Sequence, residues 1–238
     1  MIIFKKIHYV LYMIFLMLKA VKLFFIRKFK GNLEADKYVE KVELLWAEYT
    51  INKALEMNVK VVGYENIPDR PCVFIGNHTS ILDCPLLIVA SKRSIGFIAK
   101  KELIKVPIIG YWINQSKCVP IDRENARDAV KAINEGVQNI KDGYSMAVFP
   151  EGTRSLNGVL GEFKKGSMKL ATKAKAPIVP VSIDRAYRGF EIDRKFKSID
   201  TTVTFGKPIY TENLNLEEER GLSERIRSTI ASNLNLEK

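Results

Sequence analysis

The sequence has 238 residues, 47% of them hydrophobic, and a net charge of +11. This length is sufficient for one sizeable core and requires no second catalytic domain. The three cysteines lack C-x-x-C spacing, which argues against a disulfide framework or a zinc site and predicts a reducing, cytoplasmic compartment. The positive charge predicts an anionic partner, but no nucleic-acid-binding motif is present, so we expect no nucleic acid among the partners.

The segment Met1–Lys30 combines basic and apolar residues and contains no Asp or Glu. As a helix, at about 100° per residue, it would place Lys5, His8, Lys19, Lys22, Arg27 and Lys30 on one arc. The opposite, apolar face holds Ile3, Ile7, Val10, Ile14, Met17, Leu18, Val21 and Phe25. The apolar run Ile7–Leu18 is too short to span a bilayer, and Lys19 and Lys22 interrupt its extension. The pattern therefore favours a helix that lies in the membrane interface.

A cleaved signal peptide is the alternative for this segment, because Lys5 and Lys6 precede an apolar run. However, Leu18-Lys19-Ala20 is a poor cleavage site. We therefore expect the segment to remain part of the protein.

A second helix is predicted over Leu33–Met57, after a turn at Gly31-Asn32. We expect the two helices to form a hairpin, so that residues 1–57 make an amphipathic two-helix motif for association with a phospholipid surface. The alternative is that both helices simply pack on the core. Residues 58–238 are predicted to form the remaining domain.

From Val59 onward, short β-branched runs alternate with helical stretches, which predicts an α/β fold with a single sheet flanked by helices. The clearest helix is Asn125–Lys141, whose apolar residues lie on one stripe and which is followed by Gly143. The predicted strands lie near Val59–Val62, Cys72–Gly76, Ser94–Ala99, Cys118–Ile121, Ser145–Phe149, Ile178–Ile183 and Thr201–Phe205.

His78 is the only candidate for a histidine general base, because the other histidine, His8, belongs to the N-terminal segment. It follows a predicted strand, where catalytic groups of α/β proteins usually emerge. A carboxylate at Asp83 could hold the imidazole in one tautomer and stabilise the imidazolium. The run Ser80–Asp83 also matches a helix-capping box, so capping is an alternative role for Asp83.

A second cluster, Phe149–Ser155, reads F-P-E-G-T-R-S and also follows a predicted strand. Gly152 allows the backbone to approach a ligand closely, and Arg154 offers a bidentate fork that suits a phosphate. The alternative is a surface salt bridge between Glu151 and Arg154.

Two further cations, Lys100 and Arg123, also follow predicted strands. An α/β sheet can bring the ends of several strands together. The sequence therefore predicts an anion pocket beside His78.

Four blocks in order resemble the PlsC-type lysophosphatidic acid acyltransferases, the 1-acyl-sn-glycerol-3-phosphate acyltransferase family. They are N-H-x-x-x-x-D at Asn77–Asp83, V-P-I-D-R at Val119–Arg123, F-P-E-G-T-R-S at Phe149–Ser155 and I-V-P-V-S at Ile178–Ser182. The resemblance extends over about residues 59–210. It implies the mixed sheet of glycerolipid acyltransferases and identifies residues 58–238 as an acyltransferase catalytic domain.

The resemblance also implies an activity. A fatty acyl group would pass from acyl carrier protein or coenzyme A to the sn-2 hydroxyl of lysophosphatidic acid, giving phosphatidic acid for phospholipid biosynthesis. The implied catalytic residues are His78 and Asp83, and the implied substrate-binding residues are Glu151, Gly152, Thr153, Arg154, Arg123 and Lys100. Neither a metal nor another cofactor is implied, and the implied location is the cytoplasmic face of the cell membrane. The alternatives are an acyltransferase for glycerol 3-phosphate or another lysophospholipid, and a non-catalytic peripheral protein that binds anionic lipid.

Overall fold

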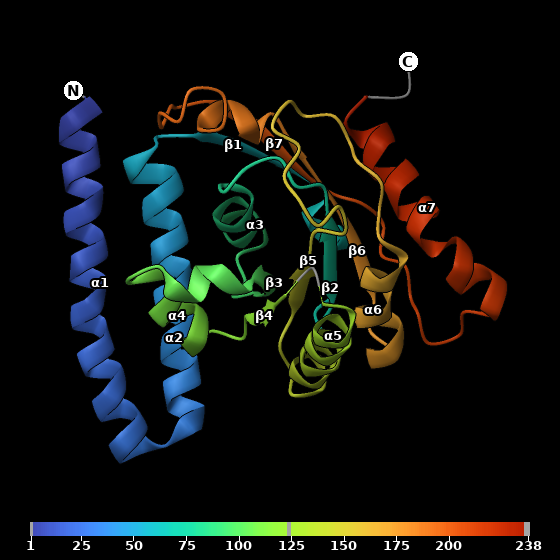
Figure 1. Ribbon diagram of the computed structural model, residues 1–238, viewed down its shortest axis with the longest axis horizontal. Coiled ribbons are helices and arrows are strands. Elements are labelled where there is room, and N and C mark those ends of the chain that lie inside the picture. The colour runs from blue at the N-terminus through green and yellow to red at the C-terminus, as the bar shows by residue number, and fades with distance from the viewer. Residues whose placement is uncertain (1, 123–124, 236–238) are drawn as a thin grey trace.

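The computed structural model describes residues 2–122 and 125–235 and is built on one seven-stranded sheet in the order β1-β7-β6-β2-β5-β3-β4 (Figure 1). Its strands are β1 (Asn58–Val62), β2 (Val73–Gly76), β3 (Gly96–Lys100), β4 (Val119–Ile121), β5 (Met146–Val148), β6 (Ile178–Asp184) and β7 (Asp200–Phe205). Neighbouring strands are parallel except for the antiparallel pair of β6 and β7. The predicted mixed sheet is confirmed, with each predicted strand within two residues of an observed one.

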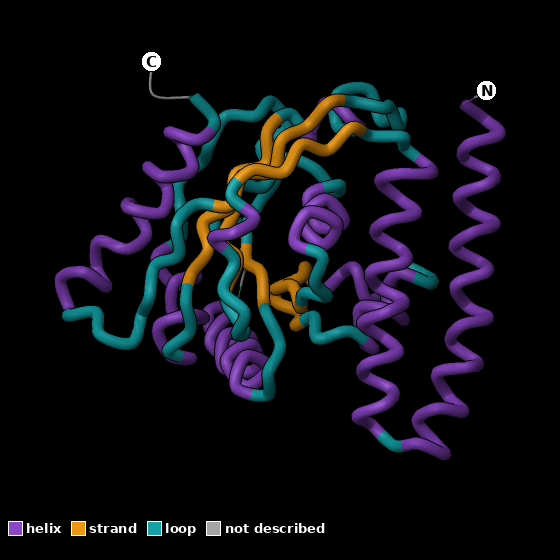
Figure 2. Tube along the Cα trace, turned by 180° about the vertical axis from the view of Figure 1, so that it is seen from behind, coloured by secondary structure: helices purple, strands orange, loops and turns teal. Residues whose placement is uncertain are grey.

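Helices cover both faces of the sheet (Figure 2). They are α1 (Ile2–Lys30), α2 (Asn32–Glu48), α3 (Asp83–Ser91), α4 (Ile109–Gln115), α5 (Ala126–Lys141), α6 (Lys169–Ala174) and α7 (Leu216–Asn233). A π-helical turn, Tyr49–Ala54, continues α2, and short 3-10 helices occupy Tyr64–Asn66, Lys101–Lys105, Lys165–Met168 and Ala186–Gly189. On one face α3 packs against the sheet with α2 behind it, and α5, α6 and α7 cover the other face.

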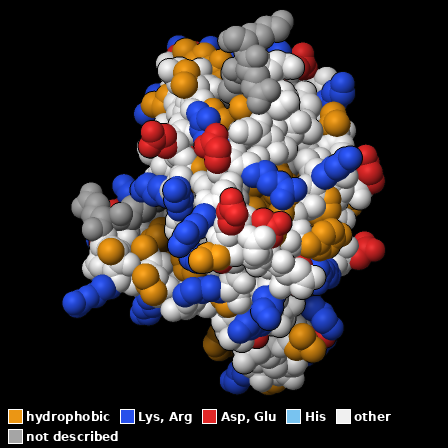
Figure 3. Space-filling view, turned by 90° about the vertical axis from the view of Figure 1, so that its right-hand side faces the viewer, with side chains coloured by type: hydrophobic (Ala, Val, Ile, Leu, Met, Phe, Trp, Pro, Cys, Tyr) orange, Lys and Arg blue, Asp and Glu red, His pale blue; other side chains and the backbone are white. Residues whose placement is uncertain are grey.

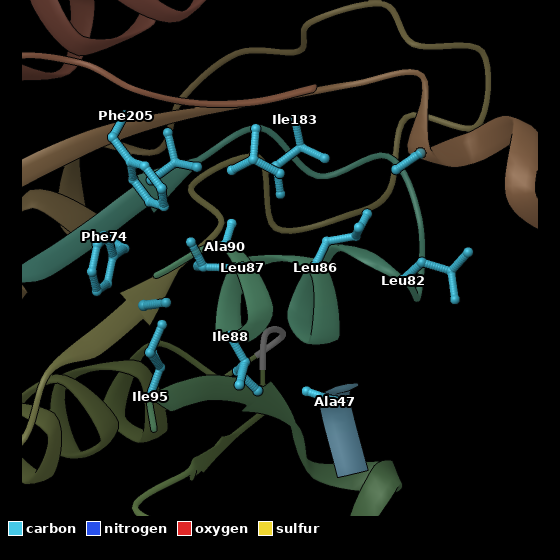
Figure 4. Packing of buried hydrophobic residues seen from close by; sticks show 14 of the residues in the cluster. Ala47, Phe74, Leu82, Leu86, Leu87, Ile88, Ala90, Ile95, Ile183 and Phe205 are labelled. Carbon is cyan, nitrogen blue, oxygen red and sulfur yellow. The ribbon is translucent and has the colours of Figure 1, made fainter. Parts of the chain in front are cut away.

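The central strand β2 is buried along its whole length, as expected for a parallel strand with helices on both faces. Side chains alternate along it: Phe74 joins the apolar cluster around α3, whereas Val73 and Ile75 join the cluster around α5 and α7. Figure 4 shows Leu86 and Leu87 of α3 packed in the first cluster. These two clusters hold β2 rigidly in the middle of the molecule.

Helix α5 begins one residue later than predicted because Asn125 is its cap. The Asn125 side chain accepts hydrogen bonds from the backbone N–H groups of Arg127 and Asp128. The second N-terminal helix also differs from its prediction, since its α-helical part ends at Glu48 and its last turns are π-helical.

The predicted helical hairpin is confirmed, with its turn at Gly31, whose φ of 84° lies in the left-handed region. Three residues of α1, Leu16, Ala20 and Leu23, are buried. On the opposite side of the helix, Ile7, Val10, Ile14, Leu18, Val21 and Phe25 are exposed. The alternative that both helices simply pack on the core does not match this arrangement, because α1 packs mainly on α2 and leaves an apolar face uncovered.

Two residues of the basic arc of α1 contact other parts of the protein while remaining exposed. Lys22 Nζ lies 5.4 Å from the centre of the Tyr38 ring, and Arg27 donates a 2.6 Å hydrogen bond to Gln115. The side chains of Ile3 and Lys5 lie outside the described part of the structure. By length and hydropathy, Ile7–Lys30 is also sufficient to cross a membrane, so the expectation that Lys19 and Lys22 prevent a span is not supported.

Positive charge is not restricted to α1. On the face of the molecule turned away from α1, Lys and Arg side chains are spread widely, with Asp and Glu side chains among them (Figure 3). This mixed distribution contrasts with the segment Met1–Lys30, which has no acidic residue.

Helix α2 is tied to the core through Glu43. Its carboxylate accepts hydrogen bonds from Ser94 Oγ at 2.5 Å and from the backbone N–H of Ile95 at 3.3 Å, immediately before β3. Burial raises the pKa of Glu43 to about 7, although these two hydrogen bonds oppose the rise. The contact between hairpin and core therefore includes a carboxyl group that titrates near neutral pH.

Replacing Glu43 by Gln should remove a pH dependence of stability. An ordinary Glu has a pKa of 4.5, so between about pH 4.5 and 7 the folded protein retains a proton that the unfolded chain releases. The free energy of unfolding should therefore fall as the pH rises through this window, by about 1–3 kcal/mol. Unfolding in detergent across this range should give a flatter slope for Glu43→Gln than for the wild type. Glu48→Gln, at an exposed position of the same helix, is the control, and equal slopes in all three proteins would contradict the assignment.

Candidate active site

The candidate site lies where β2 and β5 end. These two strands are parallel neighbours, with Ile75 paired to Val148, so their carboxyl ends lie at the same edge of the sheet. His78 follows β2 and Glu151 follows β5, and the backbone N–H of His78 donates a 2.7 Å hydrogen bond to Glu151 Oε1. The backbone N–H of Ser155 donates to the carbonyl of His78 at 2.8 Å. The pairing of β2 with β5 thus brings together the two loops that the sequence predicts to form the site.

His78 and Asp83 are in direct contact. His78 Nδ1 lies 2.8 Å from Asp83 Oδ2, and the Asp83 side chain is fully buried whereas that of His78 is 13% exposed. Because an ionised carboxylate only accepts hydrogen bonds, Nδ1 carries the proton and Nε2 keeps its lone pair. The imidazole also stacks on the Phe149 ring, with a centroid separation of 4.3 Å and an interplanar angle of 10°. This geometry provides a base held in one tautomer and one orientation.

Capping alone does not account for Asp83. Its Oδ2 accepts the backbone N–H of Ser80 at 2.8 Å, which is one half of a capping box. The other half is not formed, because the backbone N–H of Asp83 donates to the carbonyl of Ser80, and the Ser80 hydroxyl accepts from Leu82 instead. Helix α3 begins at Asp83 without a side-chain cap. The carboxylate shapes the loop and holds the imidazole at the same time.

The Glu151 carboxylate links its own loop to the His78 loop by a hydrogen bond. In addition to His78, the carboxylate accepts the backbone N–H of Gly161 at 2.9 Å. Burial raises the pKa of Glu151, and the two backbone hydrogen bonds oppose that rise. The surface salt bridge between Glu151 and Arg154 considered from the sequence is wrong: Glu151 is buried, and Arg154 pairs with a different carboxylate.

Arg154 is 31% exposed, and its Nη1 lies 2.8 Å from Glu191 Oε1. Gly152, two residues earlier, has a φ of 70°, a conformation in which other residues are strained. A Cβ atom at this position would lie 2.8 Å from Lys164 Nζ. The turn therefore requires glycine for two reasons. Its backbone conformation is strained for other residues, and Lys164 lies close to the position that a Cβ atom would take.

Two cavities adjoin this turn and share Lys164. One, of about 370 Å³, is lined by Glu151, Thr153, Ser155, Gly161, Glu162, Phe163 and Lys164. The other, of about 270 Å³, is mainly apolar and runs along α5. Among the residues that line it are Ile98, Val130, Ile133, Val148, Phe149 and Gly152.

Lys100 is less closely connected to the site than Arg154. Lys100 lies at the end of β3, is exposed, and forms an ion pair with Glu102 at 3.7 Å. Within residues 2–122 and 125–235, no hydrogen bond or ion pair joins Lys100 to His78 or Arg154. Arg123 lies outside the described residues. Of the two expected cations that the structure describes, Lys100 and Arg154, Arg154 is bonded into the network described above.

Three residues of this network have structural contacts that sequence reasoning missed. The Asn77 amide joins β2 to β6, since it donates to the carbonyl of Ile183 at 3.0 Å and accepts its N–H at 2.8 Å. Phe149 supports the imidazole, and Glu191 accepts from Arg154. Asn77 and Phe149 lie within recognised blocks, but Glu191 follows no motif, and only the folded structure identifies it.

The cysteines do not offer a nucleophile. Burial raises the pKa of Cys72 and of Cys118 to about 11 and that of Cys84 well above its ordinary value. These thiols are protonated at neutral pH. Among the described residues, no group of three or more His, Cys, Asp or Glu side chains could hold a metal ion.

Comparison with known proteins gives consistent matches. A family model described as Acyltransferase matches residues 58–184. The probable 1-acyl-sn-glycerol-3-phosphate acyltransferase of Mycoplasma genitalium is 33% identical over 215 residues, which cover 85% of this chain and 78% of that protein. The crystal structure of the 1-acyl-sn-glycerophosphate (LPA) acyltransferase PlsC from Thermotoga maritima aligns with a TM-score of 0.78 and 29% identity, covering 97% of this chain and 96% of that one.

Longer relatives match over part of their length. A chloroplastic 1-acyl-sn-glycerol-3-phosphate acyltransferase of Brassica napus is 32% identical over 209 residues, 84% of this chain. The 1-acyl-sn-glycerol-3-phosphate acyltransferase of Saccharomyces cerevisiae is 34% identical over 186 residues, 76% of this chain. The chain spans 58% of the first protein and 61% of the second.

Proposed function

The chain belongs to the acyltransferase family, and on that basis we propose that it transfers a fatty acyl group from a thioester to the sn-2 hydroxyl of lysophosphatidic acid. The product would be phosphatidic acid. The observation that carries the proposal is the 2.8 Å contact between His78 and Asp83, in a loop bonded to the loop of Arg154. The names of the relatives state this activity for those proteins.

In the proposed reaction, His78 Nε2 accepts the proton of the acceptor hydroxyl as its oxygen attacks the thioester carbonyl carbon. Asp83 stabilises the imidazolium that forms. The tetrahedral intermediate then collapses, the carbon–sulfur bond breaks, and the departing thiolate takes the proton from His78. This direct transfer needs no acyl-enzyme, in agreement with the raised pKa values of the three thiols.

The acceptor phosphate is proposed to bind at the Glu151–Arg154 turn. Arg154 would supply charge-assisted hydrogen bonds, and Thr153 would contribute from the wall of the adjoining cavity. Glu151 and Gly152 would act by shaping the turn. Lys100, at the end of β3, and Arg123, which lies outside the described residues, are proposed as further cations that assist phosphate binding.

The apolar cavity along α5 is proposed to hold an acyl chain, because it reaches Phe149, the residue on which His78 stacks. The acyl donor would be the thioester of acyl carrier protein or coenzyme A. No metal or other cofactor takes part in the proposed reaction.

Residues 1–57 are proposed to attach the protein to the cytoplasmic face of the cell membrane, leaving residues 58–238 as the catalytic domain. The support is the exposed apolar face of α1, which lies opposite the residues that pack inside the hairpin. A surface of this kind is stabilised when it enters the acyl region of a bilayer. Long-chain lysophosphatidic acid, the proposed acceptor, would lie in the same bilayer.

Replacing His78 by Ala should lower acyl transfer by about 10²–10⁴-fold, because base catalysis contributes this much. Asp83→Asn should also be impaired, since Asn can still accept hydrogen bonds from the neighbouring N–H groups but cannot stabilise an imidazolium. The measurement is the rate with purified enzyme, and thermal unfolding verifies that each variant is folded. Wild-type turnover by a folded His78→Ala protein would exclude His78 as the base.

Replacing Arg154 by Ala should raise the KM for lysophosphatidate on the order of 10- to 100-fold, because a hydrogen bond to a charged group contributes about 1.5–3 kcal/mol. Arg154→Lys should recover only part of the loss, and the KM for the acyl donor should change little. Steady-state kinetics with lysophosphatidate and with monoacylglycerol, which lacks the phosphate, provide the measurement. The control is Arg70→Ala, which breaks a surface ion pair with Glu212.

The same assay distinguishes the alternatives. Glycerol 3-phosphate and other lysophospholipids are tested as acceptors, each with both donors. A preference for one of these acceptors would replace lysophosphatidate as the substrate, and vesicle binding without any turnover would favour a non-catalytic lipid-binding protein. Equal use of monoacylglycerol by the wild type would refute a phosphate-binding role for Arg154.

Membrane attachment should depend on the exposed face of α1. Changing Ile14, Leu18, Val21 and Phe25 together to Ser should strongly reduce flotation with anionic vesicles, because each buried apolar side chain contributes about 1.5–3 kcal/mol. The matched control is Val159→Ser with Ile192→Ser, which removes exposed apolar side chains elsewhere. Undiminished flotation of the α1 variant would place the membrane contact on another surface.

A further inference from the structure

Glu191 is a buried carboxylate with no role in the reaction proposed above. It lies in the loop between β6 and β7, and its side chain is fully buried. One of its oxygens, Oε1, accepts from Arg154 Nη1 at 2.8 Å, from the backbone N–H of Ile81 at 3.0 Å and from the Ser80 hydroxyl at 3.4 Å. Among the described residues, the other oxygen has no hydrogen-bond partner, and Arg194 approaches it to 3.9 Å.

Stability alone is a poor explanation for this arrangement. A buried ion pair gains little over apolar residues of the same size, and a carboxylate oxygen without a hydrogen bond adds a further cost. What the carboxylate does provide is a connection. Ile81 lies between His78 and Asp83, so one oxygen atom joins the loop of the base to the side chain of Arg154.

We propose that Glu191 is a positioning residue that sets Arg154, and through it the acceptor phosphate, at a fixed place relative to His78. The inference rests on the proposed function, since it assumes that Arg154 binds the phosphate. A guanidinium has five N–H donors. The bond to Glu191 engages Nη1 and orients the plane of the group, which leaves other donors for phosphate oxygens.

The sign of the effect on KM separates positioning from simple charge. If Glu191 acted only as a negative charge near the phosphate, its removal would strengthen acceptor binding and lower the KM. If it positions Arg154, any change that moves the oxygen or weakens the bond should raise the KM. A displacement of about 1 Å at the reacting hydroxyl can lower kcat on the order of 10²-fold.

Two variants of different charge therefore test the proposal. Glu191→Gln removes the charge but keeps an oxygen that can accept from Ile81, and Glu191→Asp keeps the charge but withdraws the oxygen by one methylene. Both are expected to raise the KM for lysophosphatidate on the order of 10-fold and to lower kcat, with little change in the KM for the donor. Glu212→Gln, in the surface ion pair with Arg70, is the matched control. A lower KM in Glu191→Gln, with an unchanged KM in Glu191→Asp, would overturn the proposal.

A double-mutant cycle with Arg154→Ala separates this inference from the proposed function. If Glu191 acts through Arg154, adding Glu191→Gln to Arg154→Ala should raise the acceptor KM no further. Independent, multiplying increases in KM would reject the positioning role and leave the phosphate role of Arg154 intact. If Arg154→Ala alone leaves the KM unchanged, the phosphate role of Arg154 is rejected, and the role of Glu191 with it. Thermal unfolding of all variants excludes loss of folded protein as the cause.

Discussion

The buried carboxylate of Asp83 organises the loop on which the rest of the site depends. Ionised and removed from water, it needs several donors, and it receives the backbone N–H groups of Thr79 and Ser80 together with His78 Nδ1. These three hydrogen bonds require the chain between β2 and α3 to fold back around the carboxylate. The imidazole is then confined between the carboxylate and the Phe149 ring.

The same principle recurs at two other carboxylates. Glu151 and Glu191 are both buried, and both accept backbone N–H groups from the His78 loop, Glu151 at His78 itself and Glu191 at Ile81. Backbone donors thus satisfy much of the hydrogen-bonding capacity of these three carboxylates. A site built in this way holds its negative charges in place and leaves cationic side chains partly available to an anionic ligand, as the exposure of Arg154 illustrates.

The N-terminal hairpin follows a different physical logic. Leu16 and Leu23 are fully buried inside the protein, whereas Leu18 on the same helix is 64% exposed. Protein covers only one of the two opposite apolar sides of this helix. Exposure of the other side to water is unfavourable. The hairpin's attachment to the core through Glu43 near β3 means that a hairpin held at a lipid surface would also hold the sheet beside that surface.

Local sequence patterns were sufficient to predict the features that depend on neighbouring residues. Alternation of strand and helix identified the sheet, the caps and stripe identified α5, and ordered short blocks selected His78, Asp83 and Arg154. Asp83 lies five residues from His78, so the contact of their side chains follows from the loop between them. The pairing of α1 with α2 likewise follows from the single turn at Gly31.

The folded structure was needed to show which side chains from distant parts of the chain meet. It separated Glu151 from Arg154, whose surface salt bridge was the alternative considered from the sequence, and it brought Glu191 to Ile81 from 110 residues away. It also turned a second stripe of α1 inward, which a helical wheel of that helix alone could not distinguish from the exposed apolar stripe. The physical reason is that parallel strands pair across long stretches of chain. The order of the strands at the site, β6-β2-β5, depends on the packing of the whole core. The residues that this order brings together show no periodic pattern in the sequence.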